Sequence, residues 1–556
     1  MIITLLIFSY ILITSYVIGF AVIELMTRKE GGYKCRSMIS YILAGLCFQT
    51  VYAQAFSLVA PVGLWANVIM ILITIVIVML FRTGIFESVR NGFSSLGKIK
   101  SVVIIVLFLL FAYGTSHGIM HYDSDLYHAQ SIRWIEEYGC VKGLGNLHTR
   151  LAYNSASFCL SALFSLSFLL KQSYHVCAGF LAFVLACLCT GIVHDGGKVK
   201  LCLSTLSRLV AIYYLLIIFD EMVSPASDYF MVLLTLCCSI LFLDVAQTGE
   251  TSPTPYALIS LATLVILSVK ISGALLVLLA AYPAILLIGQ KKVGQTVKYL
   301  ILGIVTVTPF LIRNVILSGY LLYPVAGVDI FDFDFKIPKG LAMYDAKEIQ
   351  VYGRGFSDVN RFDESIGKWI GEWFSSLDAI NKISFIAGIV GIALLVIMIT
   401  HAIIKHDTHR LPFLIITTVI NVSFLLWLFT SPNIRYGCVF LWLAPVLTWG
   451  TLLERIQIGK IKDIIFQTCV IIFFVYKAAT FITELAGSFT TQYIICQQDY
   501  GRYEAVEYEI KGITFYRPVE GDRIGYDHFP ASVFEGEATL IKDDIIDGFM
   551  SCNPSE

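Results

Sequence analysis

Long apolar runs dominate this sequence and restrict what the chain can fold into. A helix needs about 20 apolar residues to cross the hydrocarbon core of a bilayer. Runs near or above that length lie at 2–26, 38–59, 63–82, 101–119, 175–194, 204–219, 228–246, 255–270, 271–289, 298–317, 383–404, 411–430, 434–453 and 462–486. Of the 556 residues, 57% are hydrophobic and only 14% are charged, which is more apolar surface than a soluble domain can bury. We therefore expect an all-α polytopic membrane protein with about 14 transmembrane helices.

Clusters of lysine and arginine follow alternate apolar runs and set the expected orientation. They lie after the first, third, fifth, ninth, eleventh and thirteenth runs, and such basic loops preferentially stay in the cytoplasm. Lys198, Lys291 and Lys405 are therefore expected to be cytoplasmic, whereas Asp123 and Lys347 are expected on the outer side. Both chain termini then lie outside as well.

One further apolar run breaks this alternation if it crosses the membrane. The segment 154–170 is short and begins with Asn-Ser-Ala-Ser, so we expect an interfacial helix lying on the outer leaflet. The expected parts of the chain are three N-terminal transmembrane helices (1–100), a core (101–317) with an outer loop at 120–174, a large outer loop (318–381), C-terminal transmembrane helices (382–486) and an outer tail (487–556).

The acidic tail differs from the rest of the chain in its pattern. Its stretch YEIKGITFYRPVEGDRIGYDHFP alternates apolar and polar residues between Gly and Pro, which predicts a small β-containing domain. Cys496 and Cys552 flank the tail and are a candidate disulfide in an oxidising compartment, with two free thiols as the alternative. No cysteine spacing suggests a zinc site, and the net charge of −1 gives no indication of a nucleic-acid partner.

The stretch GIMHYDSDLYHAQSIRWIEEYG, residues 118–139, places several ionisable side chains directly after an apolar run. Apolar residues at helical spacing over 125–138 predict an amphipathic helix on the outer surface. Asp123 and Asp125 could cap that helix. Together with His121 and His128, they also fit a general base or a ligand set for a hard divalent cation.

Other charged residues are expected to gather on the same outer side. Asp220 and Asp228 lie at the outer ends of adjacent runs, Lys270 lies between two runs, and Arg313 and Arg435 lie near outer exits. Charged residues close to a span are costly and indicate a functional site by default. Snorkelling of the three cations to lipid headgroups is the alternative. Three cations opposite a pair of carboxylates predict binding of a phosphate-bearing lipid.

This layout resembles the GT-C superfamily of polytopic membrane glycosyltransferases. In that superfamily a span delivers an acidic motif into a first large outer loop with two interfacial helices, as HYDSDLYHAQSIRWIEEYG and LAYNSASFCLSALFSLSFLLKQSYHVCAGF do here. The resemblance covers about residues 101–246, although three spans precede the loop and the motif reads Asp-Ser-Asp rather than Asp-Glu. Most of the chain also looks like an uncharacterised family of bacterial multi-pass membrane proteins that accompany surface-polysaccharide genes.

The resemblance implies an enzyme of the bacterial inner membrane with its active face in the periplasm. It would transfer a sugar from a polyprenyl-phosphate donor to a lipid-linked glycan or surface polysaccharide, among membrane lipids. Asp123 or Asp125 would deprotonate the acceptor, and Lys270, Arg313 and Arg435 would hold the donor phosphate. The remaining candidates for substrate binding are His121, His128, Asp220 and Asp228. As an alternative role, the carboxylates of Asp123 and Asp125 could bind Mg²⁺ or Mn²⁺.

Two other functions fit the same pattern. A polysaccharide polymerase or O-antigen ligase also combines many spans with a large outer loop and arginines. A transporter or flippase of lipid-linked glycans is the non-enzyme alternative, but few charges fall within the runs and no matching pair of Gly- or Pro-broken runs is present.

Overall fold

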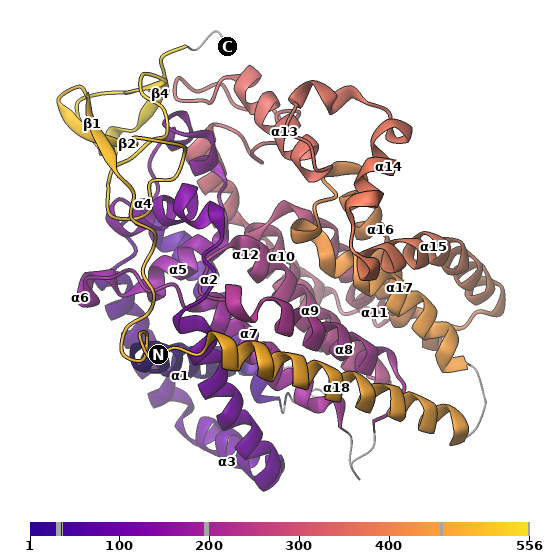
Figure 1. The fold of residues 1–556 in the computed structure, drawn as a ribbon. Helices are drawn as coiled ribbons and strands as arrows, with labels where there is room; N and C mark the ends of the chain where they lie inside the picture. The colour runs from indigo at the N-terminus through magenta and orange to yellow at the C-terminus, as the bar shows by residue number, and fades with distance from the viewer. Residues whose placement is uncertain (29–34, 36, 194–198, 456–459, 554–556) are drawn as a thin grey trace.

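The computed structural model describes the whole chain apart from residues 29–34, 36, 194–198, 456–459 and 554–556. It is mostly helical, with four short strands near the C-terminus (Figure 1). The α-helices are α1 Ile2–Thr27, α2 Met38–Ser57, α3 Leu64–Ser116, α4 Ala129–Glu137, α5 Ala156–Ser165, α6 Ser167–Leu170, α7 Cys177–Cys189, α8 Leu203–Ile217, α9 Ser227–Gln247, α10 Pro253–Val269, α11 Ala281–Gly289, α12 Val293–Ser318, α13 Lys339–Gly353, α14 Ile366–Ser376, α15 Ala379–Lys405, α16 Leu411–Thr430, α17 Ile434–Arg455 and α18 Lys460–Ser488.

Ten helices in the described part of the chain are long and apolar enough to cross a membrane, which confirms a multi-pass membrane protein. All fourteen apolar runs are helical, but they do not form fourteen long helices. α3 contains two of the runs, and three others form the shorter helices α7, α8 and α10. These three lie within the bundle, where neighbouring helices cover them.

The long helix α3 is a hairpin and not one straight rod. Its backbone leaves helical geometry at Phe81 and again at Gly97, whose φ of +68° favours glycine. Both arms of α3 pack against α1, because the Tyr10 hydroxyl donates to Asn67 Oδ1 of the first arm (2.9 Å) and the Phe8 ring lies 5.9 Å from the Phe108 ring of the second. The polar connection between the two runs is itself helical and belongs to α3.

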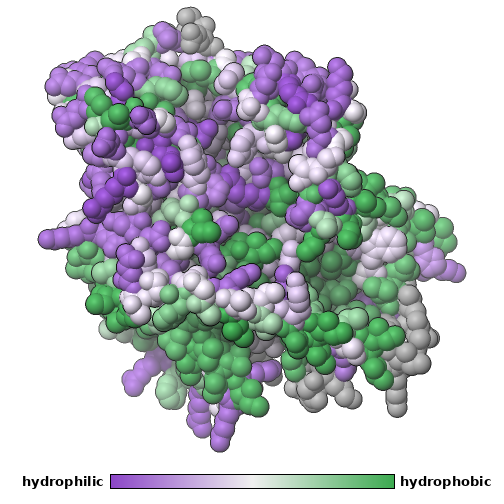
Figure 2. All heavy atoms as spheres, viewed as in Figure 1, coloured by the Kyte–Doolittle hydropathy of each residue, from purple (hydrophilic) through white to green (hydrophobic). Residues whose placement is uncertain are grey.

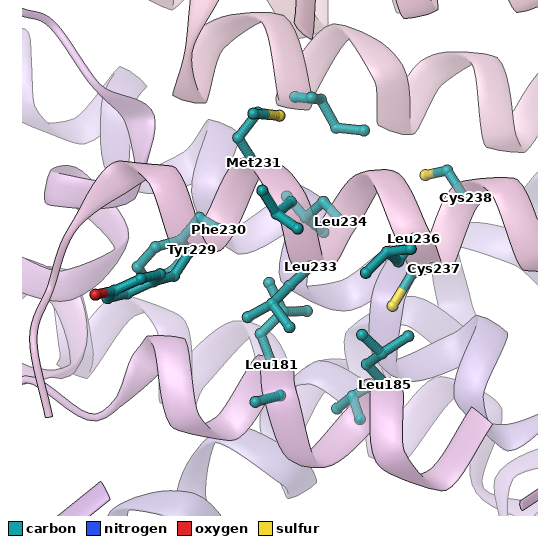
Figure 3. Close-up of a cluster of buried hydrophobic side chains, with 14 of the residues drawn as sticks. Leu181, Leu185, Tyr229, Phe230, Met231, Leu233, Leu234, Leu236, Cys237 and Cys238 are labelled. Atoms are coloured by element: carbon teal, nitrogen blue, oxygen red, sulfur yellow. The ribbon is translucent and has the colours of Figure 1, made fainter. Parts of the chain in front are cut away.

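The centre of the bundle is formed by α7 and α9, which are buried on every side. Leu181 and Leu185 of α7 face Leu233 and Cys237 of α9 (Figure 3). A helix that is hydrophobic all round belongs in the interior of a bundle. Because α9 is buried along most of its length, its first turn, which carries Asp228, is held in place at one end of the bundle.

A polar cap covers one end of the bundle. We use this name for residues 117–155, 319–378 and 489–553. Figure 2 shows hydrophilic residues gathered over the tail and the α13–α14 region, with hydrophobic residues over the helices below. The division matches the loops and tail that the apolar runs leave outside.

The prediction that the segment 154–170 lies on a membrane surface is wrong. All ten residues of α5 are buried, and it packs against α2, α4 and α7 instead of lying on a membrane surface. Leu166, in the left-handed region, separates it from α6, where Phe168 and Leu169 are exposed. Together α5 and α6 are shorter than the ten helices that are long enough to cross a membrane.

The amphipathic helix predicted over 125–138 is shorter and more buried than expected. A π-helical turn occupies Ser124–His128, and α4 begins only at Ala129. Most of its polar side is covered, because Gln130 and Arg133 donate hydrogen bonds to backbone carbonyls of the tail, and only Glu137 of this helix is exposed. A surface position on the membrane was therefore the wrong prediction for this helix.

The tail contains the expected strands. They are β1 Ala505–Ile510, β2 Ile513–Pro518, β3 Ala538–Leu540 and β4 Phe549–Ser551, which form two antiparallel hairpins, β1–β2 and β3–β4. Lys511 and Gly512 both have positive φ, as a two-residue type I′ turn between β1 and β2 requires. Trp134 of α4 packs with Phe515 and Phe549 in the core beneath the tail.

The disulfide candidate is wrong, because Cys496 and Cys552 are both free and exposed. Cys496 lies at the base of the tail, where its carbonyl accepts from the amino group of Met1 (3.5 Å). Cys552 follows β4, and its N–H donates to Glu537 O (2.9 Å). The two thiols therefore belong to different ends of the tail.

Candidate active site

A cavity of about 600 Å³ lies where the membrane helices meet the polar cap. Most of its wall is apolar, and it comes from the ends of α10, α12 and α16 below and from α13 and the segment 323–327 above. The charged residues on the wall are Asp228, Lys270, Lys347 and Arg435. Three cations against one carboxylate favour an anionic ligand with a large apolar part.

A chain of ion pairs beside this wall joins four separate segments of the sequence. The Lys270 ammonium donates to Asp228 Oδ1, and Arg435 Nε lies 3.1 Å from Asp228 Oδ2. On its other edge, Arg435 Nη2 donates to Asp123 Oδ2 at 2.8 Å. Arg435 therefore holds the carboxylates of Asp123 and Asp228 on two sides of one guanidinium.

The local fold explains how each partner reaches the cluster. Asp228 lies in the first turn of α9, where the helix dipole favours a negative charge. Lys270 is in extended conformation between α10 and the 3₁₀ helix Ile271–Ala280. Arg435 begins α17, where its N–H donates to the side chain of Asn433 (3.0 Å). All three positions are element ends, which can carry charge at the edge of an apolar bundle.

Asp123 and His121 form the end of the cluster that lies outside the cavity lining. The Asp123 side chain is 18% exposed, and neither residue lines the cavity. Burial is the largest single influence and disfavours the Asp123 anion, but Arg435 together with the neighbouring histidines and Arg150 lowers the pKa of this carboxyl overall. Burial, assisted by Arg435, lowers the pKa of His121. At neutral pH the site thus contains an ionised Asp123 and a neutral His121.

Four of the predicted site residues lie elsewhere. His128 is buried against Phe158, and burial lowers its pKa to about 3, so it carries no charge at neutral pH. Arg313 is buried and donates to Asn154 Oδ1 (2.9 Å) and Ser57, which connects α12 to α2 and to the predicted outer loop 120–174. Asp220 is exposed outside the cavity, and Asp125 binds the tail. The predicted set that comes together is His121, Asp123, Asp228, Lys270 and Arg435.

The two carboxylates offered as cation ligands point to different partners. Asp123 faces Arg435, whereas Asp125 accepts hydrogen bonds from Gly501 N–H and Tyr503 O–H, both at 2.9 Å. Across the described residues there is no group of three or more His, Cys, Asp or Glu that could hold a metal ion. Asp123 and Asp125 therefore do not share a cation site in this conformation.

Two cations that the sequence interpretation did not select lie beside the cluster. Lys347 of α13 lines the cavity, with its ammonium 5.1 Å from the centre of the Phe362 ring. The charge of Arg150 acts on Asp123 and Tyr127, yet among the described residues its guanidinium makes no ion pair or hydrogen bond. Arg150 lies in the run HTRLAYNS of the predicted outer loop, which contains no acidic residue.

Comparison with known proteins gives a family for the chain. No curated protein and no solved structure matches it. The model of one family matches residues 1–442, a range that contains every residue of the cavity and the cluster and ends before the tail. That range is well over half of the chain, and the protein therefore belongs to the family described as Domain of unknown function (DUF8201).

Proposed function

We propose that this protein is a membrane glycosyltransferase that uses a lipid-linked, phosphate-bearing sugar donor. The observation that carries the proposal is the ion-pair chain Asp123–Arg435–Asp228–Lys270 at the wall of a largely apolar cavity. Such a cavity can take both parts of an amphiphile, because apolar walls hold hydrocarbon and a few convergent polar groups fix the head group.

The donor is a polyprenyl-phosphate sugar. Its isoprenoid chain fits against the apolar wall, and its phosphate fits near Lys270, Lys347 and Arg435, which are the cations of that wall. Charge-assisted hydrogen bonds from arginine and lysine are the strong ones for phosphate. If the donor phosphate binds Lys270 in place of Asp228, the negative phosphate replaces the carboxylate as the partner of the ammonium group.

In the reaction, the acceptor hydroxyl attacks the anomeric carbon of the donor sugar. The bond between that carbon and the phosphate oxygen breaks, and its electron pair leaves with the polyprenyl phosphate. Asp123, which is ionised and partly exposed, takes the proton of the acceptor hydroxyl. Arg435 and Lys270 offset the charge that grows on the departing phosphate. The acceptor is a lipid-linked glycan or surface polysaccharide.

The resemblance to GT-C enzymes supports the same assignment and its location. On this proposal the chain lies in a bacterial inner membrane, among membrane lipids, with the polar cap in the periplasm. The cluster and the cavity both lie beside the cap, where a glycan acceptor would have access from water. The lipid donor would reach the cavity from the membrane side.

The test is sugar transfer by the purified protein in nanodiscs. Short-chain polyprenyl-phosphate sugars are supplied with lipid-linked glycan acceptors, and released polyprenyl phosphate is quantified by mass spectrometry. Asp123→Asn should lower turnover by about 10²–10⁴-fold, the usual contribution of a general base. Asp220→Asn, an exposed carboxylate outside the cluster, is the matched control and should stay within about twofold of wild type.

One outcome would contradict the assigned base, and another would contradict the function. Normal turnover in Asp123→Asn would exclude the carboxylate as the base. Transfer of an intact lipid-linked glycan across the bilayer, without release of polyprenyl phosphate, would instead identify a flippase.

A further inference from the structure

The C-terminal tail binds the segment that carries Asp123, and Asp125 is the centre of that contact. The Asp125 carboxylate accepts from Gly501 N–H and from Tyr503 O–H, both at 2.9 Å. Its backbone carbonyl accepts from Ile524 N–H (3.0 Å) and Gly525 N–H (2.8 Å). Four donors from two separate parts of the tail thus converge on one residue.

The contact continues along α4. Gln130 Nε2 donates to the carbonyls of Gly525 (2.9 Å) and His528 (2.8 Å), and Arg133 donates to Tyr526 O (2.6 Å). The hydroxyl of Tyr526 donates to Glu136. Three side chains on one face of the helix that follows Asp123 therefore hydrogen-bond to the tail.

The turn between these contacts has a conformation that needs support. Residues Ser124–His128 form a π-helical turn, which is rare and is found mostly at functional sites. Asp123 precedes the turn and reaches Arg435, whereas Asp125, two residues on, reaches the tail. Ser124, which lies between these two aspartates, makes a third contact, because its Oγ is 2.6 Å from Ser224 Oγ.

We propose that the tail is a positioning element for Asp123, with Asp125 and Tyr503 as the joint between them. This inference rests on the proposed function for the role of Asp123. Asp125 is then a positioning residue, neither a base nor a helix cap, because its side chain accepts no hydrogen bond from the N–H groups of its own helix. The matched family range ends at residue 442, so the tail adds this joint from outside that range.

The activity test compares variants at both sides of the joint. Asp125→Ala and Tyr503→Phe should each lower kcat about tenfold or more, while KM for the lipid donor stays within about twofold. The donor cations Lys270 and Arg435 belong to other elements, so donor binding is preserved. Asp125→Asn retains one accepting oxygen and should recover part of the loss. Arg517→Ala, which breaks an exposed ion pair with Glu535 elsewhere in the tail, is the control and should match wild type.

The second test needs no activity. Hydrogen–deuterium exchange of the peptide 119–128 is compared in the same full-length proteins in nanodiscs. Asp125→Ala and Tyr503→Phe should exchange at least about tenfold faster there, and Arg517→Ala should not. Tyr503→Phe removes one hydroxyl and keeps the ring, so it reports on the joint even if Asp125→Ala fails to fold.

The outcomes separate this inference from the proposed function. If no donor supports transfer but the exchange result holds, the proposed function fails and the positioning by the tail remains. Unchanged exchange at 119–128 in Tyr503→Phe would overturn the positioning. A loss of folded yield with unchanged kcat in the folded fraction would also overturn it, since the tail would then stabilise the protein without placing Asp123.

Discussion

Replacing Asp228 by asparagine removes the one carboxylate that both Lys270 and Arg435 contact. The Asp228 side chain is only 6% exposed, whereas the two cations keep 24% and 20% of their side-chain surface. Removing one partner of a buried ion pair costs about 3–5 kcal/mol. Because the two cations are partly solvated and Arg435 keeps Asp123, we expect Asp228→Asn to lower the free energy of unfolding by about 2–4 kcal/mol.

A second substitution tests whether uncompensated charge is the cause. In Asp228→Asn/Lys270→Met the unpaired ammonium is gone and Arg435 retains its contact with Asp123. The double variant should therefore recover about half of the loss or more. Denaturant titration of the purified proteins in mixed micelles measures both values. An Asp228→Asn protein as stable as wild type, or a double variant less stable than the single one, would refute the reasoning.

Three further predictions concern other parts of the molecule. Burial raises the pKa of Glu136, so the protonated form is favoured in the folded state and stability falls as pH rises above the ordinary carboxyl range; Glu136→Gln should flatten this pH dependence in denaturant titrations. Gly45→Ala would place a Cβ 1.8 Å from Ser15 O, so α1 and α2 must separate, and the unfolding free energy should fall by about 1–3 kcal/mol or more. Arg150→Gln loses no ion pair and should change stability by less than about 0.5 kcal/mol.

The membrane architecture could be predicted from the sequence because hydrophobicity acts locally. A run of about 20 apolar residues must leave water whatever surrounds it, so each run is helical. The tail was also predictable, since the Lys-Gly turn and the alternation around β1 and β2 are local signals. The merging of two runs into α3 was not, because Gly97 alone does not show whether a polar connection is helical.

The surroundings of individual helices depend on partners far away in the chain. The segment around α5 has the composition of an interfacial helix, yet α2, α4 and α7 surround it. The polar face of α4 was read as solvent-facing, whereas the tail, some four hundred residues later, supplies its hydrogen-bond partners. Amphipathicity states that two faces differ, but it does not state what covers each face.

The candidate site likewise combines features that the local sequence determines with contacts that only the packed structure determines. The sequence alone determined that Asp123, Asp228, Lys270 and Arg435 are charges at the ends of apolar runs, where burial is costly and a partner is required. Only the tertiary structure decided that Arg435 joins Asp123 to Asp228, that Arg313 belongs to a helix contact, and that Asp125 belongs to the tail. Ion pairs form over a few ångströms between residues hundreds of positions apart, and that distance is fixed only when the helices pack.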